Sequence, residues 1–294
     1  MFASKRLGWL GVALLAAGLA GAQEVGAREG GAKQDAQKQD AYELVRVAVQ
    51  TELDANRNDR SRWEYKDVYK GASGEKVSRV IETDKGTVKK KIEENGRPLT
   101  PEELQQEDAR IEAFVHDERE LAKQRKDGLQ DDRRAENMLR MLPDAFLWTV
   151  KDEDEKTVTL AFVPNPDFDP PSMEARVFAA MAGEILLDKQ QHRIRTLKGK
   201  LIRDVKFGMG LFGRMNQGGT FDVERREVAP GIWQITESHV HMQGHALLFK
   251  SIGEQEDEVK SEFRRSPVDT LEDAAVLLKG EPGSLSANRA VSTH

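Results

Sequence analysis

The sequence predicts an α+β fold, with one large curved antiparallel sheet, open like an unclosed barrel, and helices inserted on one side. Many segments rich in β-branched and aromatic residues are separated by short polar turns, which is typical of antiparallel neighbours. Helical spacing of apolar residues recurs only near the start, the middle and the end of the chain. Nothing resembling a linker divides residues 41–280. We therefore expect a single domain there.

Residues 1–22 have the three parts of a secretory signal peptide. Lys5 and Arg6 precede an apolar run over 7–19, and Ala20-Gly21-Ala22 forms a small-residue cleavage site. The run is shorter than the roughly 20 residues that cross a bilayer, although an uncleaved anchor is the alternative. Cleavage predicts a periplasmic or secreted protein with no transmembrane span in its mature form.

Composition excludes several classes of protein. The chain has no cysteine, so it has neither disulfides nor the cysteine that carries the lipid of a bacterial lipoprotein. Its 51 acidic and 45 basic residues give a net charge of −6 and are well mixed along the chain. This pattern predicts no nucleic-acid partner and no adhesion to an anionic membrane surface.

The first element of the predicted domain is a helix. Residues 23–40 are mostly Gly, Ala, Gln, Lys and Asp, and we expect them to form a flexible tether. From Ala41 onward, Tyr42, Val45, Val49 and Leu53 recur at spacings of three and four residues. That spacing places them on one face of a helix.

A three-stranded antiparallel meander is predicted over residues 63–94. Its strands are 63–69, 77–83 and 87–92, and the last two are joined by the turn Asp84-Lys85-Gly86.

A charged helical insertion is predicted over residues 100–142. The segment Thr100-Pro101-Glu102-Glu103 combines an N-cap, a proline at the first helical position and a capping box. We expect one helix to run to about Lys126 and a second to follow Gly128 as far as Pro143.

The remainder of the chain is predominantly strand. Ser172 is expected to cap a short helix that carries Val177, Phe178 and Met181, and a last helix is expected near 269–279 before a polar tail at 281–294. The predicted strands lie near 146–150, 157–163, 184–189, 192–205, 219–228, 231–242, 244–252 and 257–264.

This order of elements resembles the periplasmic lipoprotein carriers of the LolA/LolB type. The similarity lies in the leading helix around Tyr42–Leu53, the meander 63–94 and the strand pair 184–188 and 193–199. The resemblance implies an unclosed barrel whose apolar concave face holds acyl chains under a helical lid. It predicts an exported, soluble envelope protein that binds or carries an apolar or lipid-like ligand, or a lipoprotein, between sheet and helices.

Five residues are candidates for contact with such a ligand. Met209, Leu211 and Phe212 lie in a glycine-rich segment that suits an apolar flap over a pocket or a membrane-touching tip. The alternative, which we favour, is a loop packed on the sheet edge. Trp148 and Trp233 are candidate pocket residues, and for them we favour placement in the core.

One pair of histidines is a candidate metal site. His239 and His241 are two positions apart on a predicted strand, so they share a face, and Glu237 could add a third ligand. We favour the alternative that this is the polar face of the strand, with Val240 and Met242 facing the core.

The sequence contains no GxSxG, HExxH or SxxK motif, so we predict no catalytic residue, no cofactor and no enzyme activity. Two rival functions stay open. One is an envelope structural or interaction protein without a ligand cavity, which uses the charged helices to contact an envelope partner. The other is a metal-dependent enzyme built on His239 and His241.

Overall fold

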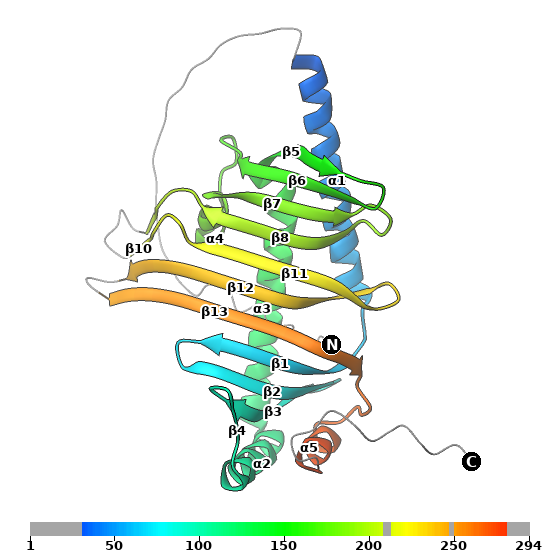
Figure 1. Ribbon diagram of the computed structural model, residues 1–294, viewed down its shortest axis with the longest axis vertical. Coiled ribbons are helices and arrows are strands. Elements are labelled where there is room, and N and C mark those ends of the chain that lie inside the picture. The colour runs from blue at the N-terminus through cyan, green and yellow to red at the C-terminus, as the bar shows by residue number, and fades with distance from the viewer. Residues whose placement is uncertain (1–30, 208–212, 247–249, 281–294) are drawn as a thin grey trace. The chain divides into compact units, whose positions relative to one another are not determined.

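The computed structural model describes residues 31–207, 213–246 and 250–280 (Figure 1). The predicted signal peptide 1–22, the loop with Met209, Leu211 and Phe212, and the predicted tail 281–294 lie outside these residues. Among the described helices, none is long and apolar enough to cross a membrane.

In the part of the chain that the structure describes, the strands form one antiparallel sheet of 13 strands. The order along it is β4 (Arg97–Pro98), β3 (Gly86–Glu94), β2 (Gly74–Thr83), β1 (Trp63–Gly71), β13 (Lys250–Arg265), β12 (Ile232–Ala246), β11 (Thr220–Ala229), β8 (Arg193–Leu201), β7 (Met181–Asp188), β6 (Thr157–Pro164) and β5 (Phe146–Glu153). Off this path, β10 (Gly213–Met215) pairs with β12 and with β9 (Val205–Phe207). Among the described strands, β4 and β5 are the two ends of this order and do not pair with each other, so the sheet is not closed, and the predicted α+β class is confirmed.

The contacts divide the described chain into two compact units. The smaller unit contains Arg60–Asp132 and the residues from Val259 onward, and the larger unit contains Arg133–Glu258 and the residues that end at Asp59. Helix α3 (Glu118–Ala145) and strand β13 contribute to both units. A single domain over 41–280 stays a prediction.

The smaller unit confirms the predicted meander and capping box. Strands β1, β2 and β3 pair in succession, and helix α2 (Pro101–His116) starts as expected. The Glu103 N–H donates to Thr100 Oγ1 at 3.3 Å, and the Thr100 N–H donates to Glu103 Oε2 at 2.7 Å. Helices α2, α3 and α5 (Leu271–Gly280) bury one face of the meander in a core of Ile81, Val88, Ile111, Val115, Leu121, Leu271, Ala274, Ala275 and Leu278.

The predicted break between the two insertion helices is wrong. Helix α2 ends at His116, helix α3 begins at Glu118, and Gly128 lies inside α3. Asp117 Oδ1 accepts hydrogen bonds from the N–H groups of Arg119 at 2.9 Å and Glu120 at 3.1 Å. Those bonds satisfy free N–H groups in the first turn of α3, which favours a helix start at this point. Gly128 does not end the helix because a glycine inside a helix costs only about 1 kcal/mol relative to alanine.

Helix α1 (Gly31–Asn58) begins earlier than predicted, so residues 31–40 are helical rather than part of a tether. The extension is rich in Ala, Gln and Lys, which have high helix propensity. Once the packed turns from Ala41 form, adding further turns no longer carries the cost of nucleation.

The strands of the larger unit differ from prediction at two places. Met181, expected on the face of helix α4 (Met173–Phe178), is the first residue of β7. Strand β12 continues without a break to Ala246, whereas one strand was predicted to end at 242 and another to begin at 244. A Cβ at Gly244 would lie 2.3 Å from Arg214 O, so glycine permits the close approach of β10 at this point.

Candidate functional site

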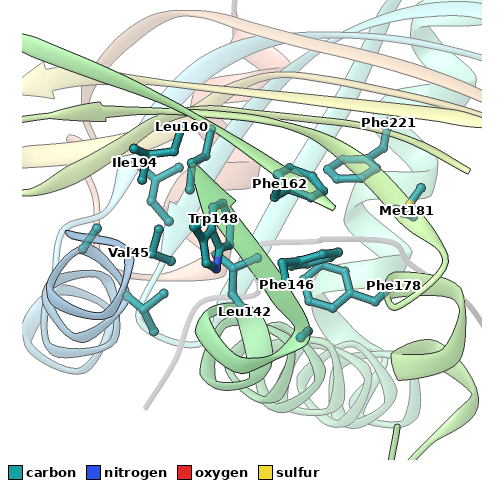
Figure 2. Close-up of a cluster of buried hydrophobic side chains, with 14 of the residues drawn as sticks. Val45, Leu142, Phe146, Trp148, Leu160, Phe162, Phe178, Met181, Ile194 and Phe221 are labelled. Atoms are coloured by element: carbon teal, nitrogen blue, oxygen red, sulfur yellow. The ribbon is translucent and has the colours of Figure 1, made fainter. Parts of the chain in front are cut away.

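An aromatic cluster lies in the apolar core of the larger unit (Figure 2). Its four members are Phe146, Trp148, Phe162 and Phe178, from β5, β6 and α4. The Phe146 ring lies 4.5 Å from that of Phe162 and 4.7 Å from that of Phe178, between ring centroids. Trp148 lies 5.3 Å from Phe162, and its Nε1–H donates to Pro143 O at 3.0 Å. Aromatic rings at these separations are in favourable contact.

Helices cover this aromatic cluster. Helix α1 and the end of α3 supply Val45 and Leu142, and the sheet supplies Leu160, Ile194 and other side chains of the same core (Figure 2). The core residues on α1 are small or β-branched for the most part: Ala41, Val45, Ala48, Val49 and Leu53. One face of the sheet in the larger unit is therefore apolar and is closed by helices.

Trp148, a candidate pocket residue, is only 2% exposed and packs inside this core. A role in ligand contact stays a prediction for Trp148.

Helix α1 also carries a buried carboxylate that sequence reasoning missed. Glu52 of α1 is 0% exposed, and its two oxygens accept hydrogen bonds from Arg193 Nε at 3.0 Å and Nη2 at 2.9 Å. The N–H of Ile194 donates to Glu52 Oε1 at 2.9 Å, and Arg225 Nη1 forms an ion pair with Oε2. We call the two guanidinium groups and this N–H the arginine site.

The arginine site holds Glu52 in its ionised form. Burial acts to raise the pKa of the Glu52 carboxyl, but the charge of Arg225 and the hydrogen bonds from both arginines outweigh it. The net effect lowers the pKa of Glu52 below its ordinary value. The signal in the sequence was an acidic residue on the apolar face of a helix, one position before Leu53.

Trp233, the second candidate tryptophan, lies next to the arginine site. Its ring centroid is 5.9 Å from the Arg193 guanidinium and 5.7 Å from that of Arg195, within the range of cation–π attraction. Its Nε1–H donates to Gln191 Oε1 at 2.9 Å. Arg195 in turn pairs with Asp188 at 2.6 Å. The Trp233 ring thus packs against the guanidinium groups of Arg193 and Arg195. Its contact with a ligand stays a prediction.

The two candidate histidines converge on a third residue that sequence reasoning missed. His239 Nδ1 lies 2.7 Å and His241 Nε2 lies 2.9 Å from the same Asp257 oxygen, on the neighbouring strand β13. Burial acts to raise the pKa of Asp257, but the hydrogen bonds from the two histidines outweigh it and lower that pKa. Glu237, the expected third ligand, is 3.8 Å from His239 Nε2.

No metal site emerges from these contacts. Within the described ranges, no group of three or more His, Cys, Asp or Glu side chains has an arrangement that could hold a metal ion. The intervening Val240 and the following Met242 are buried, on the opposite face of β12 from the histidines.

Charged pairs continue from the histidines across the same face. Asp222 lies opposite His239 in the strand register and forms an ion pair with Lys198 at 2.8 Å. Further along, Lys151 pairs with Glu184, which lies opposite Lys198. This face of the larger unit is a polar row, in contrast to the apolar face under α1.

Comparisons with known proteins leave the family open. No family model and no curated protein matches the chain. One similar solved structure is a crystal structure from Vibrio parahaemolyticus, provisionally described as an outer membrane lipoprotein-sorting protein domain. It is 10% identical, with 80% of this chain and 99% of that chain covered, at a TM-score of 0.29. A similarity of that size carries no argument, so membership of the LolA/LolB type stays a prediction.

Proposed function

We propose that the protein binds an apolar or lipid-like ligand, such as the acyl chains of a lipid or lipoprotein, between helix α1 and the sheet of the larger unit. The observation that carries the proposal is the aromatic cluster, which faces helices rather than a second sheet. Aromatic side chains offer large apolar contact areas to such a ligand.

Displacement of α1 is physically accessible because a helix satisfies its own backbone hydrogen bonds and the sheet satisfies most of its own, apart from the Ile194 N–H, which donates to Glu52. Only side-chain contacts have to break. The apolar contacts from α1 come from Ala41 and Ala48 and from the larger Val45, Val49 and Leu53. Its polar contacts include Tyr42 Oη, which donates to Asp144 Oδ1 at 2.8 Å, and the Glu52 carboxylate.

The proposal includes export to the periplasm or the medium. It is supported by the basic, apolar and small-residue segments over residues 1–22. Mass measurement of protein from the native host tests it, since cleavage after Ala22 leaves a chain that begins at Gln23.

Ligand binding is tested by fluorescence quenching with a bromine-labelled dodecanoic acid, because bromine quenches tryptophan on contact. We expect saturable quenching that is largely lost in Trp148→Phe. The matched control is Trp63→Phe, which removes an equally buried tryptophan from the smaller unit and should retain the quenching. Equal quenching in both variants, or none in the unaltered protein, would overturn the proposal.

The rival structural or interaction role has one observation in its favour, the close packing of the aromatic rings on one another. It predicts that no lipid co-purifies with the protein and that the bromine probe leaves the tryptophan signal unchanged. Native mass spectrometry of protein extracted gently and without detergent separates the two roles.

A further inference from the structure

We infer that the arginine site binds the anionic head group of an acyl-chain amphiphile, and that Glu52 occupies this site until the ligand arrives. The inference rests on the proposed function, because the chain of that amphiphile would lie in the apolar core under α1. The head group is a carboxylate or a phosphate.

The first argument is the geometry of the donors. Arg193 presents Nε and Nη2 to the two oxygens of Glu52 as a fork, the Ile194 N–H adds a third donor, and Arg225 Nη1 adds a fourth. Forked guanidinium donors with a backbone N–H match carboxylate and phosphate oxygens in general. Nothing in this set is specific to a glutamate side chain.

The second argument is the balance of charge. One carboxylate faces two guanidinium groups, and the three side chains are 0%, 6% and 14% exposed for Glu52, Arg193 and Arg225. The Nε atom of Arg225 is buried and has no hydrogen-bond partner among the described residues. A buried donor without a partner is costly, so the arginine site has room for an anion with more oxygens or more charge than Glu52 supplies.

The third argument is continuity between the two parts of the site. The backbone N–H of Ile194 belongs to the arginine site, while its side chain belongs to the apolar core that contains Trp148 (Figure 2). A head group and an acyl chain can therefore bind at adjoining places. An amphiphile, rather than a free anion or a hydrocarbon, fits both.

The fourth argument concerns helix α1 itself. Because Glu52 and Val45 lie on the same helix, a movement that uncovers the apolar face also withdraws the carboxylate from Arg193 and Arg225. A neutral ligand would leave those buried charges without a counter-charge, which is strongly unfavourable. An anionic ligand supplies a negative charge in place of the Glu52 carboxylate that α1 withdraws.

The test compares dodecanoate with dodecanol and acetate, each titrated calorimetrically into the unaltered protein near neutral pH. We expect dodecanoate to bind more tightly than dodecanol by about tenfold or more, the gain expected for charge-assisted hydrogen bonds. Acetate, which has the head group without the chain, should give no measurable binding at the same concentrations. Equal affinities for dodecanoate and dodecanol would overturn this inference and leave the proposed function standing. Failure of both to bind would overturn the proposed function itself.

Two variants test whether the preference for dodecanoate over dodecanol arises at the arginine site. Arg225→Gln should reduce the preference for dodecanoate to within about threefold, because one of the two charges is lost. The matched control is Arg195→Gln, which removes a nearby guanidinium group that pairs with Asp188 and not with Glu52, and it should retain the preference. Circular dichroism verifies that both variants are folded. A preference that persists in folded Arg225→Gln would overturn the inference, and if that variant does not fold, the comparison of the two ligands on the unaltered protein decides.

Discussion

Glu52 of helix α1 and Arg193 of strand β8 lie 141 positions apart in the sequence and form a fully buried, two-pronged ion pair. The pair joins the leading helix to the centre of the larger unit. Burial of two charges is favourable only when their hydrogen bonds are well made, and here Arg225 and the Ile194 N–H complete them. The position of α1 on the sheet is therefore set by polar as well as apolar contacts.

Replacement of Glu52 by alanine should lower the free energy of unfolding by about 3–5 kcal/mol, because it leaves the buried Arg193 and the largely buried Arg225 without their carboxylate. Urea denaturation measures the change. The control is Glu43→Ala on the same helix, whose ion pair with Arg46 is largely exposed and should contribute about 1 kcal/mol or less. Similar losses in the two variants would contradict the prediction.

The cluster of Asp257 with His239 and His241 predicts a dependence of stability on pH. The pKa of Asp257 is lowered in the folded protein, so its contribution is complete above the ordinary value near 4 and is lost as pH falls through the folded pKa. Asp257→Asn should therefore be less stable than the unaltered protein at pH 6 and should approach it below about pH 3.

Urea denaturation over a series of pH values tests this prediction. The exposed Asp269, replaced by asparagine, serves as the control and should give a curve parallel to that of the unaltered protein. A constant gap between Asp257→Asn and the unaltered protein at every pH would show that the loss is not electrostatic.

Gly183→Ala should strongly destabilise the larger unit. A Cβ at this position would lie 1.9 Å from Lys198 O and 2.8 Å from Gly199 Cα, so β7 and β8 could not keep their present separation. Overpacking of this kind costs about 1–3 kcal/mol or more. Thermal unfolding measures it, with Gly280→Ala as the control because no atom of the described residues lies within 4 Å of its added Cβ. A melting temperature unchanged in Gly183→Ala would contradict the structure there.

The capping box of helix α2 predicts a smaller effect. Thr100→Ala removes the oxygen that accepts from the Glu103 N–H and should cost about 1 kcal/mol of stability. Thr100→Ser keeps the hydroxyl and should retain most of the stability that the cap contributes. Chemical denaturation of the three proteins tests the cap, and equal losses in the alanine and serine variants would attribute the effect to the methyl group instead.

The elements that sequence reasoning placed correctly depend on neighbours in the chain. The meander over 63–94 and the cap at Thr100 follow from turn residues and from a side chain three positions away. The break at Asp117 was missed because both Asp117 and Gly128 are plausible locally, and a glycine is a weak helix breaker. The extra turns of α1 before Ala41 were missed because a polar sequence without apolar spacing also fits a tether.

The candidate site was less accessible to sequence reasoning. The shared face of His239 and His241 could be predicted from strand alternation, but Asp257 enters from another strand. Trp233 was noticed as an aromatic residue. Its two arginine neighbours, Arg193 and Arg195, lie on β8, which only the order of strands in the sheet brings near Trp233. Glu52 carried a local signal, an acid on an apolar helix face, without any indication of its partners.

The sequence by itself determined the α+β class, the alternation of strands and helices, and the absence of disulfides. These properties depend on residue spacing and composition, which are read along the chain. Only the tertiary structure decided that Glu52 meets Arg193 and Arg225, and that His239 and His241 meet Asp257. Such contacts depend on strand order and register, because β8, β11 and β13 bring together residues that no local pattern connects.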